Sequence, residues 1–407
     1  MKFTTLTESE YRKFWSKYPA RCFLSAPEIS HLHENAKVFF LGVKDSESGK
    51  TLAAAMVRGF KRRFGKYDFY APRGVLVDYQ NEELTTFFLR HLLDFLKREN
   101  GYIFRMDPNL ELAERDLDGC LVPGGRTNQP VVDLLKSLGF KKSRYVEGVS
   151  QVTWEFVLPV KGKTKDDIYN NMGPKARRRL RQALDLGIKI KDLDRSEIKS
   201  FYDILVSTAE RKSFATRDFT YFEKMYDLFA PSHSVEFVSA VINPKKTVEK
   251  LKSSLAAAES TKTASIRDKK AKNDAIKSFK TRIEKINQIF PGLPDKDMTL
   301  SSGMFMVTDP EILHFLGGNV GEYLNLDAQY VLQWEMIGRA IDRGCDLYNF
   351  YGIPANIDQH PAGYGIYAFK RGFSGHVVEL IGEYEAPLSP VYYLNKALTS
   401  LKALLKH

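Results

Sequence analysis

The segment from Asp346 to Phe373 combines a strand-like pattern, a glycine-rich stretch and a single cation. Its first residues alternate as in a strand with two different faces, with Leu347, Asn349 and Tyr351 on one face and Tyr348 and Phe350 on the other. A loop is predicted next from the residues that break regular structure, which are Gly352, Pro354, Gly363 and Gly365. Lys370 comes directly after Phe369. This order is compatible with one positive charge at the closed end of a cleft.

A carboxylate occupies a comparable place in the first third of the chain. Residues 102–106 predict a short strand, which Asp107 and Pro108 follow. The segments KRENGYIFRMDPN and AIDRGCDLYNFYGIP are both a helix end, a glycine and a strand that runs into a turn. We therefore expect Asp107 and Lys370 each to lie at a strand end in one of two similar units. The alternatives are a turn residue, because Asp-Pro commonly starts turns, and an ordinary surface lysine.

The net charge of +11 is concentrated in two places. Residues 245–288 hold 13 Lys and Arg against 5 Asp and Glu, a net charge of +8. Residues 175–191 hold 7 against 1, a net of +6, and most of these cations wrap around one predicted helix: Lys175, Arg177, Arg178, Arg179 and Arg181. Concentrated positive charge favours a polyanion as partner, either the phosphates of a nucleic acid or anionic lipid headgroups. Two solvated helix faces are the alternative.

The remaining patterns predict an α/β (α+β) protein of two domains with an inserted arm, since 407 residues exceed a single core. Mixed helix and strand patterns fill residues 1–150, and a second unit of the same kind covers 151–243 and 291–385. Between them, residues 244–290 carry apolar side chains in helical steps of 3 and 4, from Val248 and Leu251 to Ile283 and Ile286. This pattern predicts an antiparallel helical hairpin that projects as an arm. Residues 386–407 are expected to form a C-terminal helix.

Composition excludes several classes of protein. No apolar run approaches the roughly 20 residues that span a bilayer, and the first residues lack the pattern of an export signal. Cys22, Cys120 and Cys345 form no CxxC pair and are expected to be reduced thiols of a cytosolic protein. The histidines make no ligand cluster, so neither a metal nor another cofactor is expected.

Several segments together resemble the Fem family, peptidyltransferases that add bridge amino acids from aminoacyl-tRNA to peptidoglycan precursors. They occur in the family's order over most of the chain: FLSAPEISHLHENAKVFFLGV, YAPRGVLVDY, FRMDPNL, KARRRLRQALDLGIKIKDL, TAERKSFATRDFTYFEKMY, LGGN, QYVLQWEMI, DLYNFYGI and YAFKRGF. The resemblance implies two tandem acyltransferase domains of the GNAT type, with a coiled-coil arm in the second that is similar to the tRNA-binding arm of seryl-tRNA synthetase. It also implies a cytoplasmic enzyme, peripheral at the membrane face where lipid II lies, alone or in an oligomer with itself or with related transferases.

The implied reaction assigns roles to the two candidate residues. An aminoacyl ester is already activated, so the reaction needs a neutral attacking amine and a means of stabilising the oxyanion that develops. Asp107 near the amine and Lys370 near the oxyanion fit these needs, and both match residues of the family's cleft. Arg217 and Tyr221 match family residues that bind the precursor's phosphate or sugar; the alternative for Arg217 is a salt bridge with Asp218 or Glu223. Further candidates for the cleft wall are Phe315, Phe369 and Arg73, with a core role as the alternative for Phe315 and for Arg73.

One difference from the family's motifs bears on which peptidoglycan precursor accepts the amino acid. The branch of the family that uses the soluble nucleotide-linked precursor has a lysine in its N-terminal helix, whereas residues 29–33 contain none here and the first is Lys37. This difference favours lipid II. Two other functions remain open: an acyl-CoA N-acyltransferase, for which the expected R-x-x-G-x-G/A loop is missing, and a non-catalytic RNA- or membrane-binding module.

Overall fold

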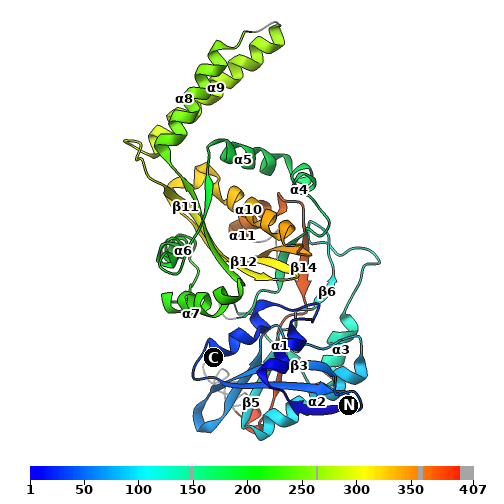
Figure 1. Ribbon diagram of the computed structural model, residues 1–407. Helices are drawn as coiled ribbons and strands as arrows, with labels where there is room; N and C mark the ends of the chain where they lie inside the picture. The colour runs from blue at the N-terminus through cyan, green and yellow to red at the C-terminus, as the bar shows by residue number, and fades with distance from the viewer. Residues whose placement is uncertain (147–149, 263–264, 356–360, 395–407) are drawn as a thin grey trace, which may run out of the picture.

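The computed structural model describes residues 1–407 except 147–149, 263–264, 356–360 and 395–407. Two mixed units lie one above the other in Figure 1, and a helical hairpin projects from the second unit. Five short 3₁₀ turns within the described residues supplement the elements below, at Phe23–Ser25, Pro27–His31, Arg63–Gly65, Ala230–Ser232 and Gly321–Leu326.

The first unit is built on a sheet with the strand order β1-β2-β3-β4-β5-β15-β7. Its strands are β1 (Lys2–Thr5), β2 (Lys37–Lys44), β3 (Thr51–Lys61), β4 (Tyr67–Ala71), β5 (Gly101–Met106), β7 (Lys141–Lys142) and β15 (Tyr384–Pro387). The helices α2 (Glu82–Arg98) and α3 (Gln129–Ser137) cover one face, where apolar side chains of both helices pack on alternate residues of β3. The helix α1 (Glu8–Trp15) lies on the other face and begins with the capping box of Thr7 and Glu10. β4 and β5 are parallel, and α2 forms the crossover connection between them. Asp107 follows directly after β5.

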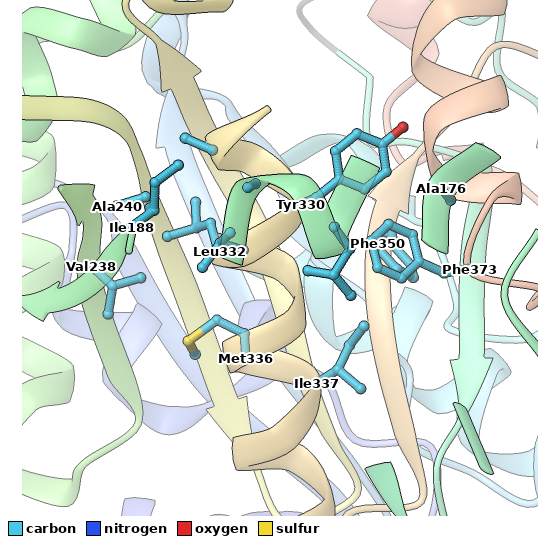
Figure 2. Packing of buried hydrophobic residues seen from close by; sticks show 14 of the residues in the cluster. Ala176, Ile188, Val238, Ala240, Tyr330, Leu332, Met336, Ile337, Phe350 and Phe373 are labelled. Atoms are coloured by element: carbon cyan, nitrogen blue, oxygen red, sulfur yellow. The ribbon is translucent and has the colours of Figure 1, made fainter. Parts of the chain in front are cut away.

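The second unit has the strand order β6-β14-β8-β13-β12-β11-β10-β9. These strands are β6 (Glu111–Glu114), β8 (Trp154–Pro159), β9 (Lys189–Asp192), β10 (Val235–Ile242), β11 (Met298–Thr308), β12 (Glu311–Asn319), β13 (Leu347–Gly352) and β14 (His376–Leu380). The helix α10 (Ala328–Asp342) joins the parallel pair β12 and β13, as α2 joins β4 and β5. Figure 2 shows Leu332, Met336 and Ile337 of α10 packed between Val238 of β10 and Phe350 of β13.

Further helices surround this second sheet. The helices on the α10 side are α4 (Lys165–Asn171), α5 (Pro174–Asp185) and α11 (Pro361–Arg371), and those on the opposite side are α6 (Ile198–Lys212) and α7 (Phe219–Phe229). Apolar side chains of α6 and α7 share one buried cluster with Tyr11, Ala54 and Met56 of the first unit. The two units are therefore packed together through a common core, and the candidate site lies beside that core.

The expected hairpin is present as α8 (Pro244–Ser260) and α9 (Ile266–Ile289), which run side by side away from the sheet (Figure 1). Val248, Leu251 and Ile286 anchor its base in the core of the second unit, and the more distant seam residues are half-buried.

Several boundaries differ from the sequence expectation. β6 pairs in the second sheet and β15 in the first, so each unit lends a short strand to the other. Whether residues 1–150 and the second unit fold as separate domains stays a prediction. The predicted loop around Gly363 and Gly365 was wrong, since both residues lie in α11. Of the expected C-terminal helix, residues 390–394 are helical, whereas Ala386 and Pro387 belong to β15 and residues 395–407 lie outside the described part of the chain.

Candidate active site

Asp107 is held in a buried position directly after β5. Only 2% of the residue is exposed, and its Oδ1 accepts hydrogen bonds from the Tyr70 hydroxyl at 2.7 Å and from the Arg73 backbone N–H at 3.0 Å. Its Oδ2 lies 3.5 Å from Arg73 Nη1 but has no hydrogen-bond partner. Burial raises the pKa of Asp107 to about 6, although Arg73 and Tyr70 act in the opposite direction. Oδ2 is therefore buried and ion-paired with Arg73 but accepts no hydrogen bond, so the carboxylate can take up a proton near neutral pH.

Arg73 connects Asp107 to the second unit. It is fully enclosed, with a left-handed backbone at φ 46°, and its Nη2 donates to Glu155 Oε1 at 2.9 Å and to the Val152 carbonyl at 2.8 Å. Both N–H groups of Nη2 are thus bound to protein acceptors in the second unit. Arg73 is therefore held in place, and its backbone N–H in turn holds Asp107. The cleft-wall role expected for Arg73 remains a prediction.

Lys370 lies near the end of α11, and the expectation of a strand end was wrong for this residue. Only 7% of it is exposed, and its Nζ donates to the carbonyls of Tyr351 at 3.1 Å and Gly352 at 2.6 Å. Burial lowers the pKa of Lys370 to about 7, partly offset by the charge of Glu155. An ammonium has three N–H donors, so one remains for an acceptor outside these two carbonyls.

Sequence reasoning missed three polar residues that lie between Asp107 and Lys370. Glu155 of β8, Glu311 of β12 and Asn349 of β13 are all buried, and Asn349 Nδ2 donates to Glu155 Oε2 at 2.9 Å and to Glu311 Oε2 at 3.1 Å. Burial and the charge of Glu155 raise the pKa of Glu311 to about 7. The sequence offers one indication of these three residues: each is a polar residue within or beside a strand that is otherwise apolar.

A second, basic cluster adjoins Asp107. Arg58 of β3 is paired in register with Tyr70 of β4, is 7% exposed, and its Nε has no hydrogen-bond partner. Arg217 is exposed and lies over the ring of Tyr221 at 4.6 Å, close enough for its charge to lower the pKa of Arg58 in addition to the larger effect of burial. In the described part of the chain Arg217 forms no ion pair with Asp218 or Glu223; Glu223 instead pairs with Arg195 at 2.8 Å. Two guanidinium groups without a carboxylate partner form a site suited to an anion.

The aromatic candidates are placed differently from each other. Phe315 lies between Phe23 at 5.0 Å and Tyr351 at 5.8 Å, ring centre to ring centre, and so lies beside the candidate site. Phe369 contacts Tyr330 at 4.8 Å and Phe373 at 5.6 Å, and thus packs on the core of the second unit.

Residues 6–400 match the model of the FemAB family. The chain belongs to this family. It is 26% identical over 423 residues to aminoacyltransferase FemA of Staphylococcus aureus (strain bovine RF122 / ET3-1), with 99% of each chain covered. It is also 26% identical over 420 residues to FemA of Staphylococcus epidermidis (strain ATCC 35984 / DSM 28319 / BCRC 17069 / CCUG 31568 / BM 3577 / RP62A), covering 99% of this chain and 100% of the relative.

Solved structures confirm the predicted fold. The crystal structure of FemX superimposes with a TM-score of 0.77 at 24% identity, covering 97% of this chain and 99% of FemX. A tandem GNAT protein from the clavulanic acid biosynthesis pathway superimposes with a TM-score of 0.50 at 10% identity, covering 96% and 99%. The FemAB family and the tandem GNAT-type fold expected from the motifs are thus both confirmed, and the expected class of enzyme agrees with the names of the FemA relatives. Among the described helices of this FemAB chain, none is long and apolar enough to cross a bilayer.

The two basic elements of this FemAB chain lie next to each other. α5 buries Ala176, Leu180 and Ala183, and its cations lie at the surface. Arg179 pairs with Asp327 at 3.3 Å and Arg177 donates to the Asn170 carbonyl, whereas in the described residues Lys175, Arg178 and Arg181 are exposed without an ion pair. Arg282 of α9 pairs with Asp185 of α5 at 3.3 Å, beside a hollow of about 410 Å³ between the two helices. α5 and the hairpin therefore form one basic surface.

Proposed function

We propose that the chain transfers an amino acid from aminoacyl-tRNA to an amine of a peptidoglycan precursor, the stem-peptide amine or the end of a growing bridge, with lipid II as the acceptor. The observation that carries this proposal is Lys370, a buried ammonium held by two backbone carbonyls with one N–H left over. A cation fixed in this way suits a charge that develops during acyl transfer. The test is to supply purified enzyme with charged tRNA and lipid II and to look for the amino acid on the acceptor.

The reaction forms one C–N bond and breaks the C–O bond of the ester. As the neutral amine attacks the ester carbonyl, it loses a proton, for which the acceptor is Oδ2 of Asp107, the carboxylate oxygen that accepts no hydrogen bond within the protein. The remaining N–H of Lys370 donates to the oxyanion or to the departing ribose oxygen, and the proton lost by the amine ends on that oxygen. No metal and no covalent intermediate is required, because the ester already supplies the driving force.

The acceptor's diphosphate is proposed to lie between Arg58 and Arg217. Both guanidinium groups lack a carboxylate partner among the described residues, and the ring of Tyr221 on α7 lies beneath Arg217. Lys224 of the same helix is paired with Glu34. Burial and the nearby cations lower the pKa of His33, which keeps that ring neutral beside the cluster. The branch of the family that uses the nucleotide-linked precursor has a lysine in the N-terminal helix, which residues 29–33 lack here. Arg58 is proposed to supply the positive charge in its place.

Replacing Arg58 by methionine is expected to raise the KM for lipid II about tenfold or more, the loss of one charged hydrogen bond of roughly 1.5–3 kcal/mol. The KM for charged tRNA should not change, and Arg217→Ala should act in the same way. The melting temperature of Arg58→Met should stay equal or rise, because a buried charge without a partner is removed. Arg195→Met, which removes an arginine already paired with Glu223 and Asp227 of α7, is the matched control and should leave both KM values unchanged. Equal effects of Arg58→Met on both substrates would contradict this assignment.

The hairpin and α5 are proposed to hold the tRNA backbone. Four lysines of the hairpin are exposed and form no described ion pair: Lys250, Lys252, Lys269 and Lys270. Their replacement by glutamine should weaken tRNA binding. The slope of log K against log salt should fall by about 0.7–0.9 for each phosphate contact that is lost. The same change at Lys2, Lys13, Lys17 and Lys50, which are exposed on the first unit, is the control. Unchanged tRNA affinity at physiological salt in the hairpin variant would overturn the proposal.

A peripheral position at the cytoplasmic face of the membrane is proposed together with lipid II. The β3–β4 turn supports it, since Phe64 is 96% exposed beside the exposed Lys61 and Arg62, a combination suited to an anionic interface. Association with a second copy or with a related transferase stays a prediction.

A further inference from the structure

Asp107 and Lys370 belong to different units, yet a continuous series of buried and partly buried hydrogen bonds connects them. The side chains between them are all 8% exposed or less. In order, the series passes from Asp107 through Arg73, Glu155 and Asn349 to the backbone of Tyr351 and then to Lys370. Every step is 3.1 Å or shorter.

Asn349 is the centre of this series because all of its polar atoms face protein partners. Its two amide hydrogens go to different carboxylates, Glu155 and Glu311, and its Oδ1 accepts from the Tyr351 backbone N–H at 2.7 Å. A neutral amide is the side chain that can donate twice and accept at the same time. An aspartate here would place a third carboxylate beside Glu155 and Glu311, and an aliphatic residue would leave three groups unpaired.

The hydrogen bond from Tyr351 determines where Lys370 can go. Tyr351 has a left-handed backbone at φ 64°, which is unfavourable for a bulky residue and persists only where the surroundings hold it. In this conformation the carbonyls of Tyr351 and the following Gly352 both point at Lys370 Nζ. The side chain of Asn349 thus stabilises the turn that forms the seat for the ammonium.

The sheet opens at the same point. The parallel pairing of β12 with β13 ends at Leu313 and Asn349, and the register of β13 against β8 shifts between Asn349 and Gly352. Irregular strands of this kind commonly redirect side chains beside active sites. Tyr351, Phe315 and Lys370 lie beyond this point, where the separating strands no longer satisfy each other's backbone groups.

We propose that Asn349 is a positioning residue for the transfer reaction: it holds the Tyr351–Gly352 turn that seats Lys370 and, through Glu155 and Arg73, ties Lys370 to Asp107. This inference rests on the proposed function, since it assigns the same two residues to the reaction. It adds that the distance between the proton acceptor and the cation is set by a buried network shared by the two units, and that substrate does not have to bring them together.

Asn349→Ala is expected to lower kcat about 10²-fold, the loss that a misplacement near 1 Å produces, with both KM values nearly unchanged. The discriminating measurement is a double-mutant cycle in single-turnover transfer. If Asn349 acts through Lys370, Asn349→Ala combined with Lys370→Met should be no slower than Lys370→Met alone. If Asn349 had a purely structural role, the loss of rate in the double variant would be the product of the losses in the two single variants.

Tyr348→Phe is the matched control. Tyr348 neighbours Asn349 on β13 but faces the opposite side of the strand, where its hydroxyl donates to Gln333 in the core. The variant loses one buried hydrogen bond, so its melting temperature should fall, while kcat should stay at the wild-type value.

The outcomes separate this inference from the proposed function. If wild-type enzyme performs no transfer, the function itself is wrong. Suppose instead that the wild type is active. The positioning role is then overturned if Asn349→Ala has the wild-type kcat, or if the loss of rate in the double variant is the product of the losses in Asn349→Ala and Lys370→Met.

Discussion

Replacing Lys370 by methionine is expected to lower kcat about 10²–10³-fold, which corresponds to roughly 2.7–4 kcal/mol of lost transition-state stabilisation. Methionine keeps most of the side-chain volume and removes the charge, so the fold should survive. The loss should appear in single-turnover transfer at saturating charged tRNA and lipid II. It should not appear in the binding of either substrate, because the charge that Lys370 stabilises exists only during the reaction.

Lys370→Arg and thermal melting are the controls for this change. Arginine restores a positive charge but has a longer, planar head that does not fit the two carbonyls in the same way, so rescue should be partial. A folded Lys370→Met variant within about threefold of wild type, well below that range, would show that the residue has no part in the chemistry.

Asp107→Asn is expected to lower kcat about 10²–10⁴-fold, the usual contribution of a positioned general base. The amide has the same shape, and its oxygen still accepts from Tyr70 and from the Arg73 N–H, so the geometry should be retained while the proton acceptor is lost. Asp68→Asn is the matched control, since Asp68 lies on β4 two residues from Tyr70 and pairs with Arg62. A near-normal rate for Asp107→Asn would leave Asp107 as a turn residue that anchors Arg73.

The same two residues predict the pH dependence of kcat. Burial raises the pKa of Asp107 to about 6, and the residue acts when ionised, so kcat should rise as the pH passes that value. Burial lowers the pKa of Lys370 to about 7, and the residue acts when protonated, so kcat should fall as the pH rises above it. The acid limb should vanish in Asp107→Asn, and the alkaline limb should move to higher pH in Lys370→Arg, since a guanidinium stays charged.

Local sequence patterns predicted the strand that leads to Asp107 but not the helix that carries Lys370. Residues 102–106, predicted as a strand, lie within β5 and miss only its first residue, Gly101. The helical steps of residues 244–290 likewise predicted the hairpin of α8 and α9. The two similar segments correctly indicated that β5 and β13 each follow a helix, with a glycine at the junction. Asp107 was thereby placed at the end of β5. The structure adds that each strand is the parallel partner of a neighbouring strand.

Contacts between distant segments could not be predicted in this way. Glu155, Glu311 and Asn349 are up to 194 residues apart in the chain, and each one alone is only an odd polar residue near an apolar strand. Arg58 likewise stands in the apolar run AAAMVRGF, and nothing local says that Arg217 lies nearby. The exchange of β6 and β15 between the sheets rests on strands of only four residues, too short to have a pattern.

The error at α11 has a different cause. Glycine in a helix costs about 1 kcal/mol, so two glycines favour a loop on local grounds. Here Gly363 is required by close packing, since a Cβ would lie 2.2 Å from Pro354 Cγ, and Tyr367 and Phe373 bury their rings in the core. Tertiary contacts therefore outweighed the local preference.

The most direct test is a donor competition with wild-type enzyme. Purified protein is given lipid II together with a mixed pool of charged tRNA, and in a parallel reaction with acyl-CoA; products are identified by mass. The account predicts an amino acid on an acceptor amine, its appearance dependent on charged tRNA and lost in Lys370→Met. Transfer from acyl-CoA, or binding of tRNA and lipid II with no transfer at all, would contradict it.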